Sequence, residues 1–249
     1  MKQLTTFFFL ILVAMTFGQS IKKPDNEITG HLFTLTYSNN GQINGIIDEF
    51  YFSQGAYLPN NDVFKYKQCD LKFNFHYEYV THKNFSFFCK VGYSVRKDIY
   101  TISNVTPAHG SKEQNYLNIS LGSKYNFRVD RFQFSTGIEI PFYNISTYKE
   151  KFFYDNTTQT IHSTQFIDGG TAFGLNSISS IKFFLSKKIF LSTDLTFGLL
   201  FFNLGGQTYS VIDYQNPVVY PTTGQSRDDK YNKTAVTKPE FYFGIGIKI

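Results

Sequence analysis

Residues 69–79 read Cys-Asp-Leu-Lys-Phe-Asn-Phe-His-Tyr-Glu-Tyr, with an apolar, aromatic or thiol side chain at every odd position. Neighbouring side chains of a β-strand point to opposite faces, so this period of two predicts a strand with one dry face and one wet face. The stretch from Phe85 to Arg96 repeats the pattern after a short polar segment, residues 82–84. The two stretches together predict an antiparallel hairpin.

Six further segments alternate in the same way. They are Phe33–Tyr37, Leu117–Tyr125, Phe132–Phe142, Phe173–Leu185, Ile189–Phe201 and Phe241–Ile249. The composition agrees with strands, because 29 Phe and 18 Tyr are present in 249 residues and aromatic side chains favour a pleated surface. The chain is therefore predicted to be all-β, with about eight strands and ten as the alternative count.

Side-chain volume decides which face of these strands lies inside. An eight-stranded barrel has an interior just wide enough for side chains to fill it. The apolar set consists mainly of Phe, Leu, Ile and Tyr and would overfill that space, whereas the polar set is rich in Gly and Ser. A soluble lipocalin-type barrel or a sandwich, which would bury the apolar set, is the competing fold. The volumes favour a transmembrane antiparallel up-and-down β-barrel.

Short and long connections alternate along the chain. Short turns are predicted around residues 82–84, 126–130 and 186–188, and long polar loops over residues 38–66, 97–115, 144–170 and 203–239. Membrane barrels have short periplasmic turns and long extracellular loops. Both ends of the barrel domain are therefore predicted on the periplasmic side, which requires an even number of strands.

Residues 1–18 predict a cleaved signal peptide. Lys2 precedes an apolar run from Leu4 to Val13, and small residues stand before a cut at Gln19. The run is shorter than the roughly 20 residues that span a bilayer, which favours cleavage over a membrane anchor. Residues 19–249 are then the barrel domain, and the predicted location is the cell outer membrane. The formal net charge of +5 is too small to favour a nucleic acid as partner.

The signal peptide, the alternating strands and the closing stretch 241–249, Phe-Tyr-Phe-Gly-Ile-Gly-Ile-Lys-Ile, resemble those of small outer-membrane barrels of Bacteroidetes. This grouping includes PorT-like and OmpA/OmpX-like barrels, and the resemblance covers essentially the whole mature chain. It implies recognition by the barrel-assembly machinery during biogenesis. The implied assembly signal consists of Phe241, Phe243, Ile245, Ile247 and Ile249. The chain departs from the family pattern at Ile249, where Phe is the commoner residue.

The polar face carries the candidate functional side chains. The inward set is predicted to be an ion-paired lumen network of Asp70, Lys72, His76, Glu78, Lys90, Arg96, Lys124, Glu139, Lys182 and Asp194. An acid–base or metal cluster around His76 is the alternative interpretation. Buried charges need partners whatever their role, so the structural network is favoured. No catalytic residue, metal ligand or cofactor is predicted.

Cys69 and Cys89 fall on the apolar faces of neighbouring strands. With a turn near Lys83, Cys69 is predicted to pair close to Val95 and Cys89 close to Phe75. The two sulfurs would then be too far apart for a bridge. No intramolecular disulfide is predicted.

The favoured function is an outer-membrane barrel with a structural, partner-docking or envelope/secretion-assembly role and no catalysis. A narrow porin-like channel for small solutes is the first alternative, and a lipid A-modifying enzyme is the second. The adjacent His162 and Ser163 lie in a predicted loop and would point apart in an extended chain. The predicted partners are outer-membrane lipid and lipopolysaccharide, and envelope proteins reached through the long loops.

Overall fold

The computed structural model describes residues 29–38, 43, 63–102, 108–156, 159–214 and 223–249, so the predicted signal peptide lies outside the described residues. These ranges hold eleven strands. They are β1 (Gly30–Ser38), β2 (Val63–Val80), β3 (Phe85–Ile102), β4 (Ala108–Val129), β5 (Phe132–Ile145), β6 (Tyr148–Asn156), β7 (Gln159–Ile167), β8 (Gly170–Phe184), β9 (Ile189–Tyr214), β10 (Thr223–Val236) and β11 (Glu240–Lys248). Within the described ranges no helix is long and apolar enough to cross a bilayer.

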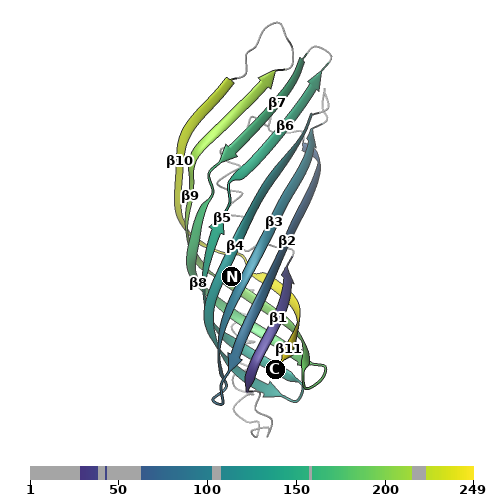
Figure 1. Ribbon diagram of the computed structural model, residues 1–249, viewed down its shortest axis with the longest axis vertical. Coiled ribbons are helices and arrows are strands. Elements are labelled where there is room, and N and C mark those ends of the chain that lie inside the picture. Colours follow the sequence, from purple (N-terminus) through teal and green to yellow (C-terminus); the bar gives the residue numbers. More distant parts are fainter. Residues whose placement is uncertain (1–28, 39–42, 44–62, 103–107, 157–158, 215–222) are drawn as a thin grey trace, which may run out of the picture.

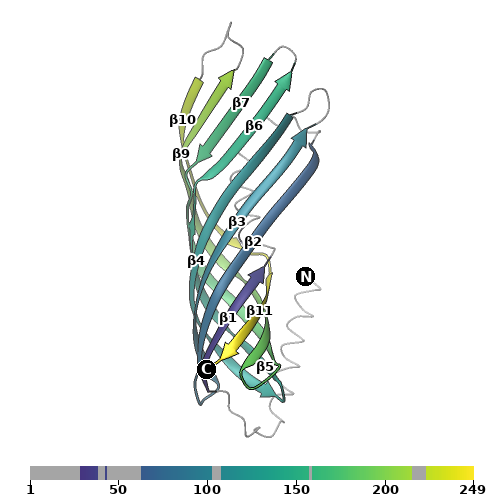
Figure 2. The same ribbon diagram turned by 45° about the vertical axis from the view of Figure 1, so that its right-hand side comes forward.

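Eight of the strands form a closed antiparallel ring in the order β1, β2, β3, β4, β5, β8, β9 and β11. The ring closes because β11 pairs with β9 on one side and with β1 on the other, as Phe243 lies opposite both Thr193 and Tyr37. Figure 1 and Figure 2 show this ring as the lower part of an elongated molecule. The eight strands are those that the alternation predicts, and the predicted antiparallel up-and-down barrel is confirmed.

Like faces meet across every pair of the ring, because the register keeps the apolar positions opposite one another. Phe75 lies opposite both Leu35 and Val91, and Leu121 lies opposite both Cys89 and Ile140. The apolar side chains point outward and the polar ones inward. Phe87, for example, is 60% exposed on the outside, whereas its neighbour Phe88 is 4% exposed on the inside.

Three short turns lie at one end of the ring, which we call the turn end. Residues 82–84 and 186–188 form three-residue turns, closed by hydrogen bonds from the Thr81 amide to the Phe85 carbonyl and from the Leu185 amide to the Ile189 carbonyl. Both turns are as predicted. Asn84 has a φ of 63°, the left-handed conformation that commonly ends such a turn. Gly30 and Ile249, the two ends of the described barrel, lie at this end too.

The turn predicted over residues 126–130 is wrong in its bounds. β4 continues to Val129, and only Asp130 and Arg131 connect it to Phe132. Asn126 belongs to the strand because its side chain is buried inside the barrel, where it donates to Ser86 Oγ at 3.0 Å. A polar residue in an inward position resembles a turn residue in sequence.

Three of the long loops predicted at the opposite end, the far end, are largely strands where the structure describes them: residues 97–115, 144–170 and 203–239. Most of the fourth, residues 38–66, lies outside the described residues. β2, β3, β4 and β9 extend beyond the ring, β6 and β7 form a hairpin, and β10 pairs with the extension of β9. The result is a curved sheet that continues one side of the barrel wall (Figure 1, Figure 2). These strands have polar residues on both faces, so they lack the period of two by which the other strands are recognised.

Two clusters of buried apolar residues lie in the interior, one toward each end of the ring. Leu32, Val80, Phe184 and Phe190 form a floor beside the turns. A larger plug lies toward the far end and consists of Ile43, Tyr116, Tyr143, Ile145, Tyr148, Ile167, Ala172, Leu200, Phe202 and Leu204. Polar side chains fill the space between the floor and the plug.

Candidate functional site

The site with the most chemistry is a charged layer between the floor and the plug. It contains four lysines and four carboxylates, all buried, and one buried histidine. They are Lys72, Lys90, Lys124 and Lys182, then Glu78, Glu139, Asp194 and Glu240, with His76 among them. Among the described side chains of the layer, the cations and anions are equal in number. A buried layer with charges of one sign would strongly destabilise the barrel. Equal numbers allow each buried charge to lie near a charge of the opposite sign.

Glu78 is the centre of one half of the layer. Its Oε2 accepts a hydrogen bond from Lys182 Nζ at 2.6 Å and lies 3.6 Å from Lys124 Nζ and 3.7 Å from His76 Nε2. His76 also faces Asp194, with Nδ1 3.9 Å from Oδ2. The strands β2, β4, β8 and β9 supply these groups, so one carboxylate connects opposite walls of the barrel.

Lys72 is the centre of the other half. Its Nζ donates to Glu240 Oε2 at 3.1 Å and to the Tyr242 hydroxyl at 2.7 Å. The same ammonium lies 5.6 Å from the ring centres of Tyr116 and Tyr143 in the plug, a cation–π arrangement. Between the two halves, Lys90 donates to Glu139 at 2.8 Å and Lys124 donates to the Ser180 hydroxyl at 3.0 Å. Every lysine of the layer therefore has a hydrogen-bond partner inside the barrel.

A second balanced cluster borders the plug on its far side, under the extended sheet. The hydroxyls of Tyr100 and Tyr148 donate to Glu150 at 2.8 and 3.1 Å, and Lys112 Nζ lies 3.7 Å from the same carboxylate. Burial, followed by the charge of Glu150, raises the pKa of both tyrosines well above its usual range. On the outer surface nearby, the hydrogen bond from Lys97 holds the pKa of Glu113 below its usual range.

The structure places nine of the ten predicted lumen residues inside the barrel as buried side chains. The exception is Asp70, which pairs with Arg96 through the backbone but whose side chain is outside the described ones. Arg96 lies beyond the plug, where its Nη2 donates to Asp98 at 2.8 Å, and so it is separate from the charged layer. The other eight share the layer.

Several members of these clusters are not predicted from the sequence. Glu240 follows Pro239 at the end of a predicted loop, although its even number places it on the same face as Tyr242. Asp98, Lys112 and Glu150 fall in stretches that are predicted to be loops. The alternation along β11 could have identified Glu240, because even-numbered residues of that strand share the inward face. The sequence around Asp98, Lys112 and Glu150 does not alternate and gives no such signal.

The side chains considered for acid–base chemistry or catalysis lie on two different strands, His76 on β2 and His162 with Ser163 on β7. His76 is in contact with carboxylates and with the edge of the Phe88 ring, at 5.0 Å between ring centres, and the described hydrogen bonds include none between it and a hydroxyl or thiol. His162 packs on Phe153 at 5.0 Å and lies in β7, where its neighbour Ser163 points to the other face of the strand. No group of three potential ligands in the described part of the chain could hold a metal ion.

The cysteines pair two residues further along than predicted. Cys69 lies opposite Lys97, and Cys89 lies opposite Tyr77. The Cys69 and Tyr77 positions on β2 are then roughly 27 Å apart at 3.4 Å per residue. The register keeps the two cysteines far from each other, and Cys89 is a free thiol.

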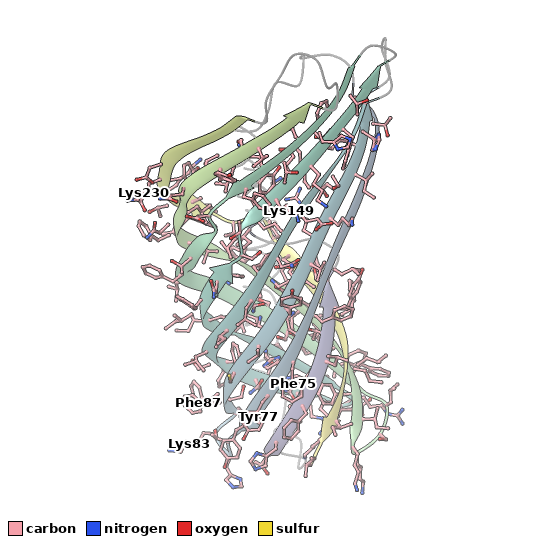
Figure 3. All side chains as sticks on the ribbon, turned by 45° about the horizontal axis from the view of Figure 1, so that its top comes forward. Phe75, Tyr77, Lys83, Phe87, Lys149 and Lys230 are labelled. Carbon is pink, nitrogen blue, oxygen red and sulfur yellow. The ribbon has the colours of Figure 1, made fainter. Side chains whose placement is uncertain are left out.

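An apolar belt covers the outside of the ring. On β3 it runs from Phe85 to Val95, and it continues around the wall as exposed apolar or aromatic side chains on the other seven strands. The predicted assembly residues Phe241, Phe243, Ile245, Ile247 and Ile249 are all exposed and lie on the outward face of the closing strand. Figure 3 shows Phe75, Tyr77 and Phe87 along the lower wall.

No protein-family model matches the chain, and no curated protein matches it. Among solved structures, the outer membrane protein OprG from Pseudomonas aeruginosa is similar at 12% identity and a TM-score of 0.39, over 89% of this chain and 96% of that one. A major outer membrane protein from Thermus thermophilus is similar at 10% identity and a TM-score of 0.41, over 88% and 100%. Similarity at this level carries no function over to this chain.

Proposed function

We propose that the protein is an outer-membrane β-barrel whose interior is sealed, and that it serves as a structural or partner-docking element of the envelope. The observation that supports the membrane location is the apolar belt. A soluble protein rarely exposes a contiguous apolar patch beyond a few hundred Å², whereas here outward residues of all eight ring strands are apolar and exposed. Such a surface is suited to contact with the hydrocarbon chains of a membrane.

The height of the belt agrees with a bilayer. From Phe85 to Val95, β3 advances by about ten steps of 3.4 Å, and a strand tilt near 40° reduces this to roughly 26 Å along the barrel axis. The apolar band of a transmembrane barrel is about 25 Å tall. Aromatic residues flank the band, with Tyr125 and Phe132 at the turn end and Tyr37 and Phe173 at the other. Such residues favour the membrane–water interface.

The interior argues for a docking or structural role rather than transport. The floor closes the turn end with four apolar side chains, and the plug closes the other end with the ring side chains of Tyr116, Tyr143 and Phe202 among others. Between them, the charged layer has equal numbers of cations and anions and therefore offers no net attraction to an ion of either sign. A pathway for solutes would require both apolar closures to move.

The extended sheet at the far end is the surface that supports docking. The curved sheet formed with β6, β7 and β10 stands beyond the belt, and it carries polar residues such as Lys149 and Lys230 (Figure 3). Lys151, also on β6, is exposed. With the short turns in the periplasm, this sheet faces the cell exterior. Envelope proteins or lipopolysaccharide are the partners that we propose for it.

Two measurements test this function. Unboiled protein should migrate differently from boiled protein on a gel, as a closed barrel does, and equal mobility would contradict the barrel in the membrane. In planar bilayers the protein should give no discrete conductance steps. Steps that persist and that change when Phe190 is replaced by Ala would favour the narrow channel instead.

A further inference from the structure

The turn end carries an excess of positive charge that the sealed interior does not use. Among the described residues there, six side chains are basic and one is acidic. The basic ones, which we call the basic collar, are Lys83, Arg128, Arg131, Lys187, Lys188 and Lys248, and the acid is Asp130. Each of the three turns contributes at least one member and β11 contributes another, so the collar surrounds the whole mouth of the barrel.

The collar residues have no described carboxylate partner within 4.0 Å. Arg128 donates from Nε to the carbonyl of Asp130 at 2.7 Å, and its guanidinium stacks over Phe184 of the floor at 5.1 Å. At the far end two of the described lysines lie in ion pairs, Lys97 with Glu113 at 2.8 Å and Lys230 with Asp228 at 3.7 Å. The described side chains of the turn end therefore carry an excess of five cations that no described ion pair offsets.

The position of the collar sets what it can contact. Tyr79 and Phe85 flank the first turn, Tyr125 lies near the second and Phe132 directly follows it, and all four are exposed on the outward face. Aromatic residues of this kind mark the headgroup level of a bilayer. Lys83 stands two residues from Phe85 and Arg131 one residue from Phe132. Flexible lysine and arginine side chains at these positions reach the phosphates of the same leaflet.

We propose that the basic collar binds the phosphate groups of anionic phospholipids in the leaflet at the turn end. This inference rests on the proposed membrane location. Lysine and arginine pair with phosphate oxygens through charge-assisted hydrogen bonds. The binding anchors the barrel at a fixed depth and selects anionic over zwitterionic lipid around the turns.

The absence of tryptophan from the chain makes the test simple. Phe85→Trp places a reporter at the turn end and Phe173→Trp places one at the other edge of the belt, and the two positions have similar exposure, 50% and 52%. Each reporter protein is reconstituted in phosphatidylcholine vesicles that contain brominated phosphatidylglycerol or brominated phosphatidylcholine. The ratio of quenching by brominated phosphatidylglycerol to quenching by brominated phosphatidylcholine gives the preference for the anionic lipid at each end.

We expect the ratio to exceed one at position 85 and to be near one at position 173. A single basic residue near an anionic surface contributes about a fivefold preference, so the ratio at position 85 should be at least severalfold. Replacing Lys83, Arg131, Lys187 and Lys188 together by Gln should lower the ratio severalfold, with Arg128 and Lys248 left in place. High salt should bring the ratio close to one. The matched control replaces Lys97, Lys151, Lys230 and Lys238 by Gln and should leave the ratio at position 85 unchanged.

Equal ratios at the two positions, or a ratio that survives the fourfold substitution at the turns, would overturn the proposal. Loss of the preference on addition of millimolar inorganic phosphate would also overturn it, since the collar would then bind a soluble anion. Each variant is first run unboiled on a gel. A protein that shows the barrel shift but no preference refutes the collar alone, whereas a protein with no shift refutes the membrane barrel.

Discussion

Lys72 and Glu240 are 168 residues apart in the chain, yet Nζ of the first lies 3.1 Å from Oε2 of the second in the middle of the barrel, and neither side chain is exposed. The pair connects β2 with β11 across the interior, although these strands are not neighbours in the wall and β1 lies between them. It therefore forms only when the ring has closed.

Removing one member of this pair should strongly destabilise the barrel. Glu240→Ala leaves the ammonium of Lys72 buried with only the Tyr242 hydroxyl as hydrogen-bond partner, and breaking a buried pair costs about 3–5 kcal/mol. Urea unfolding of the folded protein in vesicles measures this loss. The double variant Lys72→Met/Glu240→Leu should recover most of it, because two apolar side chains need no partner; a double variant as unstable as Glu240→Ala would contradict the account.

A charge placed on the belt should cost much more than a charge placed beyond it. Leu121 is 59% exposed near the middle of the belt, and Arg at the bilayer midplane costs about 2–4 kcal/mol in a membrane barrel. Tyr209 is also exposed but lies on the far part of β9, outside the belt. We expect Leu121→Arg to lower the free energy of unfolding by that amount and Tyr209→Arg to change it by less than about 0.5 kcal/mol. Equal effects would argue against lipid around the belt.

Gly122 should tolerate no side chain. A Cβ at this position would overlap the Ile138 carbonyl of β5 and the ring of Phe88 inside the barrel. At Gly92 the atoms nearest to an added Cβ belong to the side chains of Asn74 and Asn118, which can rotate. Overpacking costs about 1–3 kcal/mol, so Gly122→Ala should be near the top of that range and Gly92→Ala near the bottom. Chemical denaturation of both variants checks the order, and the reverse order would be inconsistent with the packing.

The cluster around Glu150 predicts alkaline sensitivity. The pKa values of Tyr100 and Tyr148 are raised in the folded protein, while an unfolded tyrosine ionises at about 10. The two tyrosines therefore contribute fully to the free energy of unfolding below pH 10. As the pH rises above 10, this contribution is lost by about 1.4 kcal/mol per pH unit for each tyrosine. The Tyr100→Phe/Tyr148→Phe variant should be less stable than wild type at pH 8 but should lose less stability between pH 10 and 11. If wild type and the double variant lose equal stability between pH 10 and 11, the buried cluster around Glu150 is contradicted.

The ring could be predicted from the sequence because one side of each strand contacts an apolar environment and the other a polar one. Residues 69–79 carry this contrast at every position, and the same parity places His76 and Glu78 together inside. The far sheet could not be predicted in the same way, since strands such as β6 and β10 carry polar residues on both faces. The partners within the layer, such as Lys182 with Glu78, depend on which strands face one another across the ring, and periodicity gives no information on that.

The most direct test of the central claim uses the adjacent residues Phe87 and Phe88, which are 60% and 4% exposed on opposite faces of β3. Phe87→Trp and Phe88→Trp are reconstituted separately in vesicles with brominated acyl chains, after each has shown the barrel shift on an unboiled gel. We predict strong quenching of the tryptophan at position 87 and little at position 88. Strong quenching at position 88 with little at position 87, or equal quenching at both, would contradict a barrel with its apolar face in lipid and its polar face sealed inside.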